Sequence, residues 1–471
     1  MENHPQSPSA LERVSRWISQ SVMLKLFVVG FLMLLLLIPT AMLQDLIHER
    51  QATRDTAVSE ITSKWGTDQT VSGPVISIPY ETEVLTDKGT KVTETAYAHF
   101  LPENLNITGS IVPEKRYRGI YVVMLYNAKI KIEGTFKTPE LSLLKIPADR
   151  AKLNEAVVSL GLTDLKGIKE AVKLQFGNQA LMFNPGVETR DLFYSGVSVP
   201  IRLEAGQTTY KFSCELNLNG SSEVRFMPFG RETNVHLRSS WGTPSFVGAF
   251  SPDHSNISDK GFTADWKVLQ YNRNYPQQGT GSFIGHGNTN ESDAAEVRPV
   301  VANNPNGNES GEFGVKLLLP INEYQKTMRS VKYAAMFILI TFTAFFFIEI
   351  LNRRKLHPVQ YLLVGFAICL FYVLLLSISE HLSFQWAYLI GCVTILALVS
   401  FYTHSIFKNT RLTLIFNGVL VLLYGFFYSL LQMEDYSLLL GSIGLLLILG
   451  TVMYLTRNID WYRVYERKEG E

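Results

Sequence analysis

The chain has 471 residues, of which 46% are apolar and 18% charged, and its formal net charge is +1. A near-neutral balance with no block of Lys or Arg lacks the electrostatic footprint of a nucleic-acid-binding protein, so we expect no nucleic-acid partner. A chain of this length can hold more than one domain. The apolar runs are unevenly distributed, because nearly all of them lie between Leu26 and Leu43 or after Ala334.

The N-terminal part predicts a membrane anchor. Residues 1–22 are polar and predict a cytoplasmic arm, and residues 23–43 contain an apolar run long enough for a transmembrane helix. A cleaved signal peptide is the alternative, but the run is longer than a usual signal core and has no A-x-A-like cleavage site. Residues 44–65 predict an amphipathic stalk, because apolar residues recur at approximately helical spacing: Leu43, Ile47, Val58, Ile61 and Trp65.

Residues 66–330 predict a large β-rich, sandwich-like periplasmic domain. The clearest strand lies between residues 210 and 218, where apolar and polar side chains alternate. Asn219-Gly220 then predicts a hairpin turn. Leucines and valines at spacings of three and four predict a helical insertion between Ala148 and Val172. Two polar, turn-rich stretches predict loops, Gly279–Asp293 and Asn303–Gly311.

Residues 331–456 predict a block of five transmembrane helices, followed by a cytoplasmic tail at residues 457–471. The expected spans are 333–351, 359–379, 385–401, 412–431 and 436–455. Basic residues flank the short loops on one side, and acidic residues lie in the loops on the other. By the positive-inside rule, both termini are cytoplasmic and residues 44–330 are periplasmic.

The three cysteines offer no disulfide framework. Cys369 and Cys392 lie inside apolar spans, which leaves Cys214 alone in the soluble part. A free cysteine in an apolar strand pattern behaves as a small hydrophobic residue, so we expect Cys214 to be buried.

A search for catalytic motifs favours a protein that is not an enzyme. The soluble part has no H-E-x-x-H, no G-x-S-x-G and no Cys/His zinc spacing, so we expect no metal and no cofactor. Ser142-Leu-Leu-Lys145 fits S-x-x-K, but the S-D-N and K-T-G partners of that motif are absent. The interiors of the last four spans lack charged residues, which disfavours an ion-coupled transporter. Glu349 precedes Arg353 by four residues, a spacing that favours a helical ion pair near the cytoplasmic interface.

The candidate site is an outer polar cluster of Glu380, His381, Glu434 and Asp435. These residues form two turns that end different helical hairpins on the same side of the predicted bundle. Together they would make an acidic patch that binds a cation or a basic surface. The alternative is that short outer loops are simply polar.

Several stretches resemble the CreD family of bacterial inner-membrane proteins, which is associated with cell envelope integrity and stress responses. They occur in order along nearly the whole chain: KRYRGIYVVMLYNAKI (115–130), SSWGTPSFVGAF (239–250), GFTADW (261–266), RSVKYAAMFILITFTAFFFIE (329–349), HPVQYLLVG (357–365), LLLSISEH (374–381), FQWAYLIG (384–391), YGFFYSLLQMEDYSLLLGSIG (424–444) and MYLTRNIDWY (453–462). The resemblance implies a bacterial inner (cytoplasmic) membrane protein with a periplasmic domain. It implies no catalytic residues.

These observations favour a non-enzymatic multipass protein that supports envelope integrity and the envelope stress response. Its partners would be the lipid bilayer and another envelope component, either a protein or a cell-wall component. The alternative is a membrane-embedded enzyme or transporter that acts on a lipid or a cell-wall precursor, with the outer polar cluster as its centre.

The charge pattern generates a test of topology. Reporter fusions at Asn308 should be active in the periplasm, whereas fusions at Lys408 and Glu471 should be active in the cytoplasm. A periplasmic signal from Glu471 would contradict the number of spans.

Overall fold

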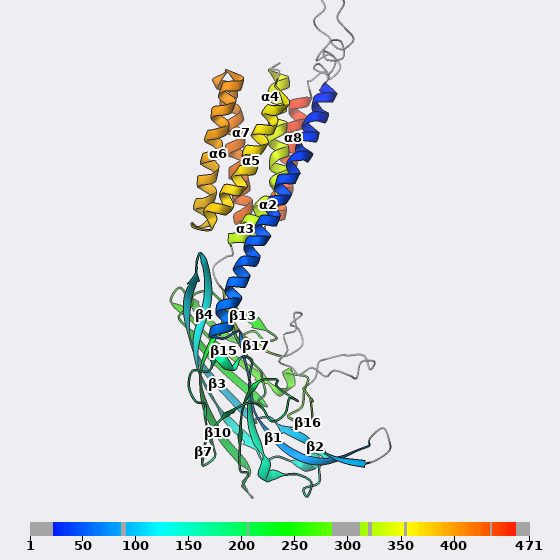
Figure 1. The fold of residues 1–471 in the computed structure, drawn as a ribbon, viewed down its shortest axis with the longest axis vertical. Coiled ribbons are helices and arrows are strands. Elements are labelled where there is room, and N and C mark those ends of the chain that lie inside the picture. Colours follow the sequence, from blue (N-terminus) through cyan, green and yellow to red (C-terminus); the bar gives the residue numbers. More distant parts are fainter. Residues whose placement is uncertain are drawn as a thin grey trace, which may run out of the picture. The chain divides into compact units, whose positions relative to one another are not determined.

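The computed structural model describes residues 22–85, 91–204, 207–284, 311–318, 323–352, 356–433 and 436–457. The chain divides into two compact units, one of residues 1–53 and 321–471 and the other of residues 54–320. The first unit is built from helices and the second mainly from β-strands (Figure 1). One long helix, α2, contributes residues to both.

The helical unit contains the apolar segments. Its helices are α2 (Val22–Trp65), α3 (Glu323–Lys332), α4 (Ala334–Leu351), α5 (Pro358–Ser379), α6 (Phe384–Phe407), α7 (Thr410–Gln432) and α8 (Ser437–Thr456). Within the described residues, α2, α5, α6 and α7 are long and apolar enough to cross a membrane. Helices α3 and α4 meet at 43° and qualify together as one bent span, and the apolar part of α8 is shorter. The prediction of an N-terminal apolar helix followed by a C-terminal block of apolar helices is confirmed.

Helix α2 packs as a member of this helical unit. Its buried positions follow one another at spacings of four, four, three and four residues, which places them on one face of the helix: Leu32, Leu36, Thr40, Leu43 and Ile47. Leu36 packs over Gly365 of α5, where an added Cβ atom would come within 2.2 Å of the Leu36 Cδ1 atom. Glycine at this position therefore allows α2 to approach α5 closely.

The second unit consists of two β-sheets. In the nine-stranded sheet the order is β13-β17-β11-β1-β5-β9-β8, with β2 paired to β1 and β16 to β2, and in the eight-stranded sheet it is β14-β15-β12-β3-β4-β10-β6-β7. The strands are β1 (Gln69–Leu85), β2 (Lys91–Phe100), β3 (Asn104–Arg118), β4 (Tyr121–Lys137), β5 (Val157–Leu162), β6 (Lys173–Phe176), β7 (Gln179–Met182), β8 (Asn184–Pro185), β9 (Gly196–Pro200), β10 (Thr209–Ser221), β11 (Glu223–Phe226), β12 (Glu232–Ser239), β13 (Pro244–Gly248), β14 (His254–Ser258), β15 (Gly261–Leu269), β16 (Gln278–Thr280) and β17 (Phe313–Leu317). Short 3₁₀ turns are η1 (Leu141–Leu144), η2 (Leu153–Glu155), η3 (Leu165–Gly167) and η4 (Gln270–Asn272).

One hydrophobic core contains side chains from both sheets. Strand β10 alternates buried and solvent-facing positions as its sequence predicts, and Cys214 on its buried face is only 2% exposed. Burial raises the pKa of the Cys214 thiol to about 12, so the thiol is protonated at neutral pH. The prediction of a buried Cys214 is confirmed.

The helix predicted between Ala148 and Val172 is wrong. This stretch contains the turns η2 and η3 and strand β5, all six residues of which are buried. Strand β5 lies between β1 and β9, and its residues are buried on both faces of the sheet. A central strand covered on both faces has a continuous apolar run, whose spacing can imitate that of a helix.

The hairpin predicted at Asn219-Gly220 is also wrong. Strand β10 continues through both residues to Ser221, and Ser222, with φ of 54°, leads into β11 of the other sheet. Gly220 is required for packing, because an added Cβ atom would lie 2.3 Å from the Tyr126 hydroxyl oxygen. Of the predicted loop Gly279–Asp293, Gly279 and Thr280 belong to β16, and residues beyond 284 lie outside the described part. The predicted loop Asn303–Gly311 lies outside it except for Gly311.

Candidate functional site

A polar groove crosses the outer face of strands β3, β12, β15 and β14. Two hollows of about 830 and 470 Å³ follow one another along these strands. Strand register aligns the outward-facing side chains in rows, so that His236 lies between Thr108 of β3 and Asp265 of β15. We define the polar groove by these side chains: Asn106, Thr108, Ser110, Asn234, His236, Arg238, Thr263, Asp265, Lys267, His254, Asn256 and Ser258.

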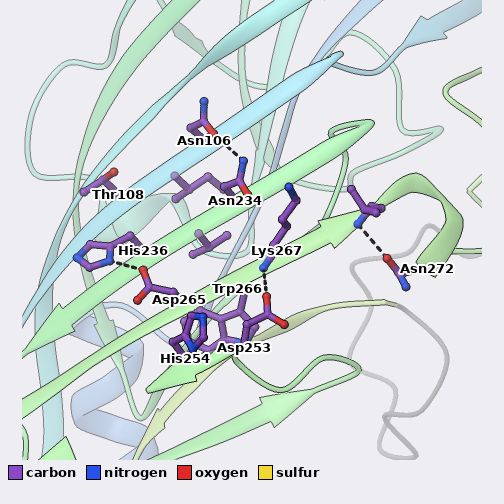
Figure 2. A pocket seen from close by; sticks show the side chains of 13 residues that line it. Asn106, Thr108, Asn234, His236, Asp253, His254, Asp265, Trp266, Lys267 and Asn272 are labelled. Atoms are coloured by element: carbon purple, nitrogen blue, oxygen red, sulfur yellow. Dashed lines mark hydrogen bonds and ion pairs between the residues drawn. The ribbon is translucent and has the colours of Figure 1, made fainter. Parts of the chain in front are cut away.

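Hydrogen bonds within the first hollow connect neighbouring strands (Figure 2). The Asn234 amide donates to the Asn106 side-chain oxygen over 3.1 Å, and His236 Nδ1 lies 2.6 Å from Asp265 Oδ1. The Lys267 ammonium lies 3.1 Å from a carboxylate oxygen of Glu232. Charged groups here are therefore largely compensated by one another, and the groove presents donors and acceptors with little net charge.

The composition of the groove differs from that of the adjoining strands in the same sheet. Outward positions of β4 and β10 carry mainly charged side chains, such as Lys129, Lys131 and Glu215, as expected for a solvated face. The groove strands also carry charged side chains, Arg238, Asp265 and Lys267, but most of the groove side chains are amides, hydroxyls and imidazoles. Asparagine is depleted in strands, yet Asn106, Asn234 and Asn256 lie within β3, β12 and β14. Asn127 of β4 and Asn217 of β10 bond to each other, whereas the Asn106 amide nitrogen has no hydrogen-bond partner among the described residues, which favours a binding role for the groove face.

A second polar arrangement joins Ser77, His99 and Asp191. The Ser77 hydroxyl lies 2.8 Å from His99 Nδ1, and His99 Nε2 lies 3.0 Å from Asp191 Oδ2. This hydrogen bond holds the pKa of the Asp191 carboxyl below its usual value. In serine hydrolases the serine bonds to Nε2 and the aspartate to Nδ1, which is the reverse order.

Burial argues against nucleophilic catalysis by this arrangement. His99 is 1% exposed and Ser77 is 3% exposed, so a substrate has no access to the hydroxyl in this conformation. Asp191 belongs to residues 186–195, which connect β8 and β9 without helix or strand. The arrangement fastens that connection to strands β1 and β2.

Among the described residues of the helical unit, the Glu349 carboxylate of α4 is the most buried charged group. Its side chain is 4% exposed, and Oε1 lies 2.5 Å from Lys25 Nζ of α2. The same oxygen accepts a hydrogen bond from the Leu356 backbone N–H over 3.2 Å, and Oε2 accepts one from the Tyr361 hydroxyl over 2.8 Å. The carboxylate thus connects α2, α4 and α5. Arg353, the partner that the sequence suggested, lies outside the described residues.

Of the predicted outer polar cluster, the structure describes Glu380 and His381. Glu380 caps the C-terminal end of α5, accepts a hydrogen bond from the Tyr324 hydroxyl over 3.2 Å and lies 3.8 Å from Arg50 Nε of α2. His381 is exposed. Glu434 and Asp435 lie outside the described residues, so the convergence of the four side chains stays a prediction. Among the described residues, no group of three or more His, Cys, Asp or Glu side chains could hold a metal ion.

Sequence reasoning missed the groove, the Ser77–His99–Asp191 arrangement and the Lys25–Glu349 pair. The groove had a signal, because Asn106 and Asn234 lie in strand-like segments that alternate polar and apolar residues. The other two join residues that are far apart in the chain, such as Lys25 and Glu349, which are separated by 324 positions. No local pattern reveals such pairs.

An anchor helix, a large β-rich unit and a following block of apolar helices define a multipass membrane protein. Residues 21–462 match the protein family described as Inner membrane protein CreD. The chain is 32% identical over 441 residues to the Inner membrane protein CreD of Escherichia coli (strain K12). The aligned region covers 91% of each of the two chains. The chain therefore belongs to the CreD family, and it is an inner-membrane protein.

The Lys25–Glu349 pair generates a stability prediction. Replacing Lys25 by Met leaves a buried carboxylate without its cation, so the free energy of unfolding in detergent should fall by about 3–5 kcal/mol. The double variant Lys25→Met, Glu349→Gln should recover much of that loss, because a neutral amide needs no counter-charge. Chemical denaturation of the purified protein, monitored by tryptophan fluorescence, measures the change.

Lys64→Met is the matched control. Lys64 belongs to the same helix and forms an i,i+4 pair with Glu60 at 3.0 Å, but its side chain is 73% exposed. Its loss should change stability by less than about 1 kcal/mol. A double variant at positions 25 and 349 that is less stable than Lys25→Met would contradict the proposed role of the Lys25–Glu349 ion pair.

Proposed function

We propose that this inner-membrane protein supports the integrity of the cell envelope and its stress response by binding another envelope component through the polar groove. The observation that carries the proposal is the local composition of the eight-stranded sheet. One part of its outer face has hollows in which amide, hydroxyl and imidazole side chains predominate, whereas the adjoining part has the lysines and glutamates of a solvated surface. Binding sites characteristically combine a concave shape with a few placed polar groups.

The charge pattern of the sequence supports the orientation that this role requires. With both termini cytoplasmic, residues 44–330 face the periplasm, and the groove is accessible to envelope components. The proposal includes the predicted segments: a cytoplasmic arm to residue 22, an anchor to 43, a stalk to 65, a periplasmic domain to 330, a transmembrane block to 456 and a cytoplasmic tail. The compact β-rich unit of residues 54–320 is consistent with one large periplasmic domain.

A binding role without catalysis accounts for the polar arrangements described above. Ser77 and His99 are too buried to meet a substrate. Glu380 is engaged by Tyr324 and Arg50, which gives it a structural role at the end of α5. An outer acidic patch that also includes His381, Glu434 and Asp435 remains a secondary proposal, with a cation or a basic surface as its ligand.

The groove generates a functional prediction. A groove variant with Asn106→Ala, Asn234→Ala and His236→Ala should insert at normal levels, because its changes are on the outer face of the sheet and leave the core intact. It should fail to restore detergent resistance to a strain that lacks this protein and is detergent-sensitive. Colony survival on deoxycholate measures the outcome.

A control variant with Lys129→Ala, Lys131→Ala and Glu215→Ala changes the same number of side chains on the same sheet face. It should restore resistance fully, since these residues lie outside the groove. If the groove variant, at equal membrane levels, restores detergent resistance as fully as the control variant does, the proposed function is wrong.

A further inference from the structure

We infer that the ligand of the polar groove is a glycan, a chain of hydroxyl- and acetamido-bearing sugars with an acidic substituent at one end. This inference rests on the proposed function and names the chemistry of the ligand. It follows from three features of the groove: its mostly uncharged donors and acceptors, its dimensions and its cationic end.

The side chains of the groove match the hydrogen-bonding groups of sugars. An amide offers donors and an acceptor in one plane, and a hydroxyl or a neutral imidazole offers one of each. Sugar hydroxyl and acetamido groups need the same mixture. Among the described residues, the Thr108 hydroxyl and the His254 ring have no hydrogen-bond partner, and the Asn106 amide uses only its oxygen. These groups are available to a ligand.

A protein partner fits this face less well. Cores of protein–protein interfaces are rich in aromatic and apolar side chains. The outward side chains of the groove are polar, and the exposed apolar ones that line the hollows are Val112 and Leu269, at opposite ends. A ligand that is polar along its length avoids burying polar groups without partners.

The dimensions suit an oligosaccharide. Successive rows of side chains are two residues apart along each strand, so the rows from Asn106 to Val112 extend for about 20 Å. Beyond Leu269, at the end of β15, the turn η4 carries an exposed aromatic side chain. Tyr271 of η4 is 85% exposed and lies beside Asn272, which lines the first hollow. An exposed tyrosine ring can stack on the C–H groups of a sugar face.

The opposite end of the groove is cationic. Arg238 and Lys260 line the second hollow, and neither has an ion-pair partner among the described residues. In the first hollow, by contrast, Lys267 and His236 are paired with acidic side chains. The unpaired guanidinium favours a carboxylate or phosphate on the sugar chain at this end.

Binding to the purified full-length protein in detergent tests the inference with two probes. The first is the neutral tetrasaccharide of N-acetylglucosamine, and the second is soluble cell-wall glycan whose peptides carry carboxylates. The wild-type protein should bind both probes and bind the acidic one more tightly. The groove variant should lose at least tenfold in affinity for both, and the control variant should bind as the wild type does.

Arg238→Gln separates the cationic end from the rest of the groove. It should abolish the preference for the acidic probe, and it should lower affinity for the neutral tetrasaccharide far less than the groove variant does. Absence of saturable binding to either probe, or equal binding by the groove variant, would overturn the inference. If the wild type binds neither probe and the groove variant still fails to restore detergent resistance, the ligand is not a glycan and the proposed function stands.

Discussion

Among the described residues, ion pairs at two points attach α2 to the other helices of the helical unit, and this same helix contributes residues to both units. Lys25 pairs with Glu349, and Arg50 lies near Glu380. The two cations are 25 residues apart, about 37 Å of helix, whereas the hydrocarbon core of a bilayer is about 30 Å thick. Both pairs can therefore lie near the membrane interfaces, with the buried stripe from Leu32 to Ile47 between them. Because α2 continues to Trp65, this helix also supplies the first residues of the β-rich unit.

Local patterns predicted those parts of the fold that depend on neighbouring residues. Period-two alternation identified the buried face of β10, including Cys214, and long apolar runs identified the helices after residue 333. The pattern failed around β5, a strand buried on both faces, where leucines and valines recur at helical spacing. It also failed at Asn219-Gly220, where tight packing against Tyr126 requires the glycine and no hairpin forms. In both cases tertiary contacts determine the structure.

The candidate site was less predictable, because it depends on strand register. Asn106 and Asn234 belong to strands that are 128 residues apart in the chain, and only the parallel pairing of β3 with β12 brings them together. The sequence directed attention to acidic turns at the ends of helices instead. Of these, Glu380 has a hydrogen bond and an ion pair within the helical unit. The difference in composition between the groove strands and strands β4 and β10 appears only once the sheet order is known.

Hydrogen–deuterium exchange of the full-length protein tests the central claim, glycan binding in the groove, most directly. Strand β14 forms the edge of its sheet, so part of its backbone is unpaired and responsive to a bound ligand. With the N-acetylglucosamine tetrasaccharide, exchange should slow in peptides that cover residues 232–239 and 254–269 and stay unchanged in residues 209–221. Protection of residues 209–221 alone, or of no segment at saturating tetrasaccharide, would contradict the account.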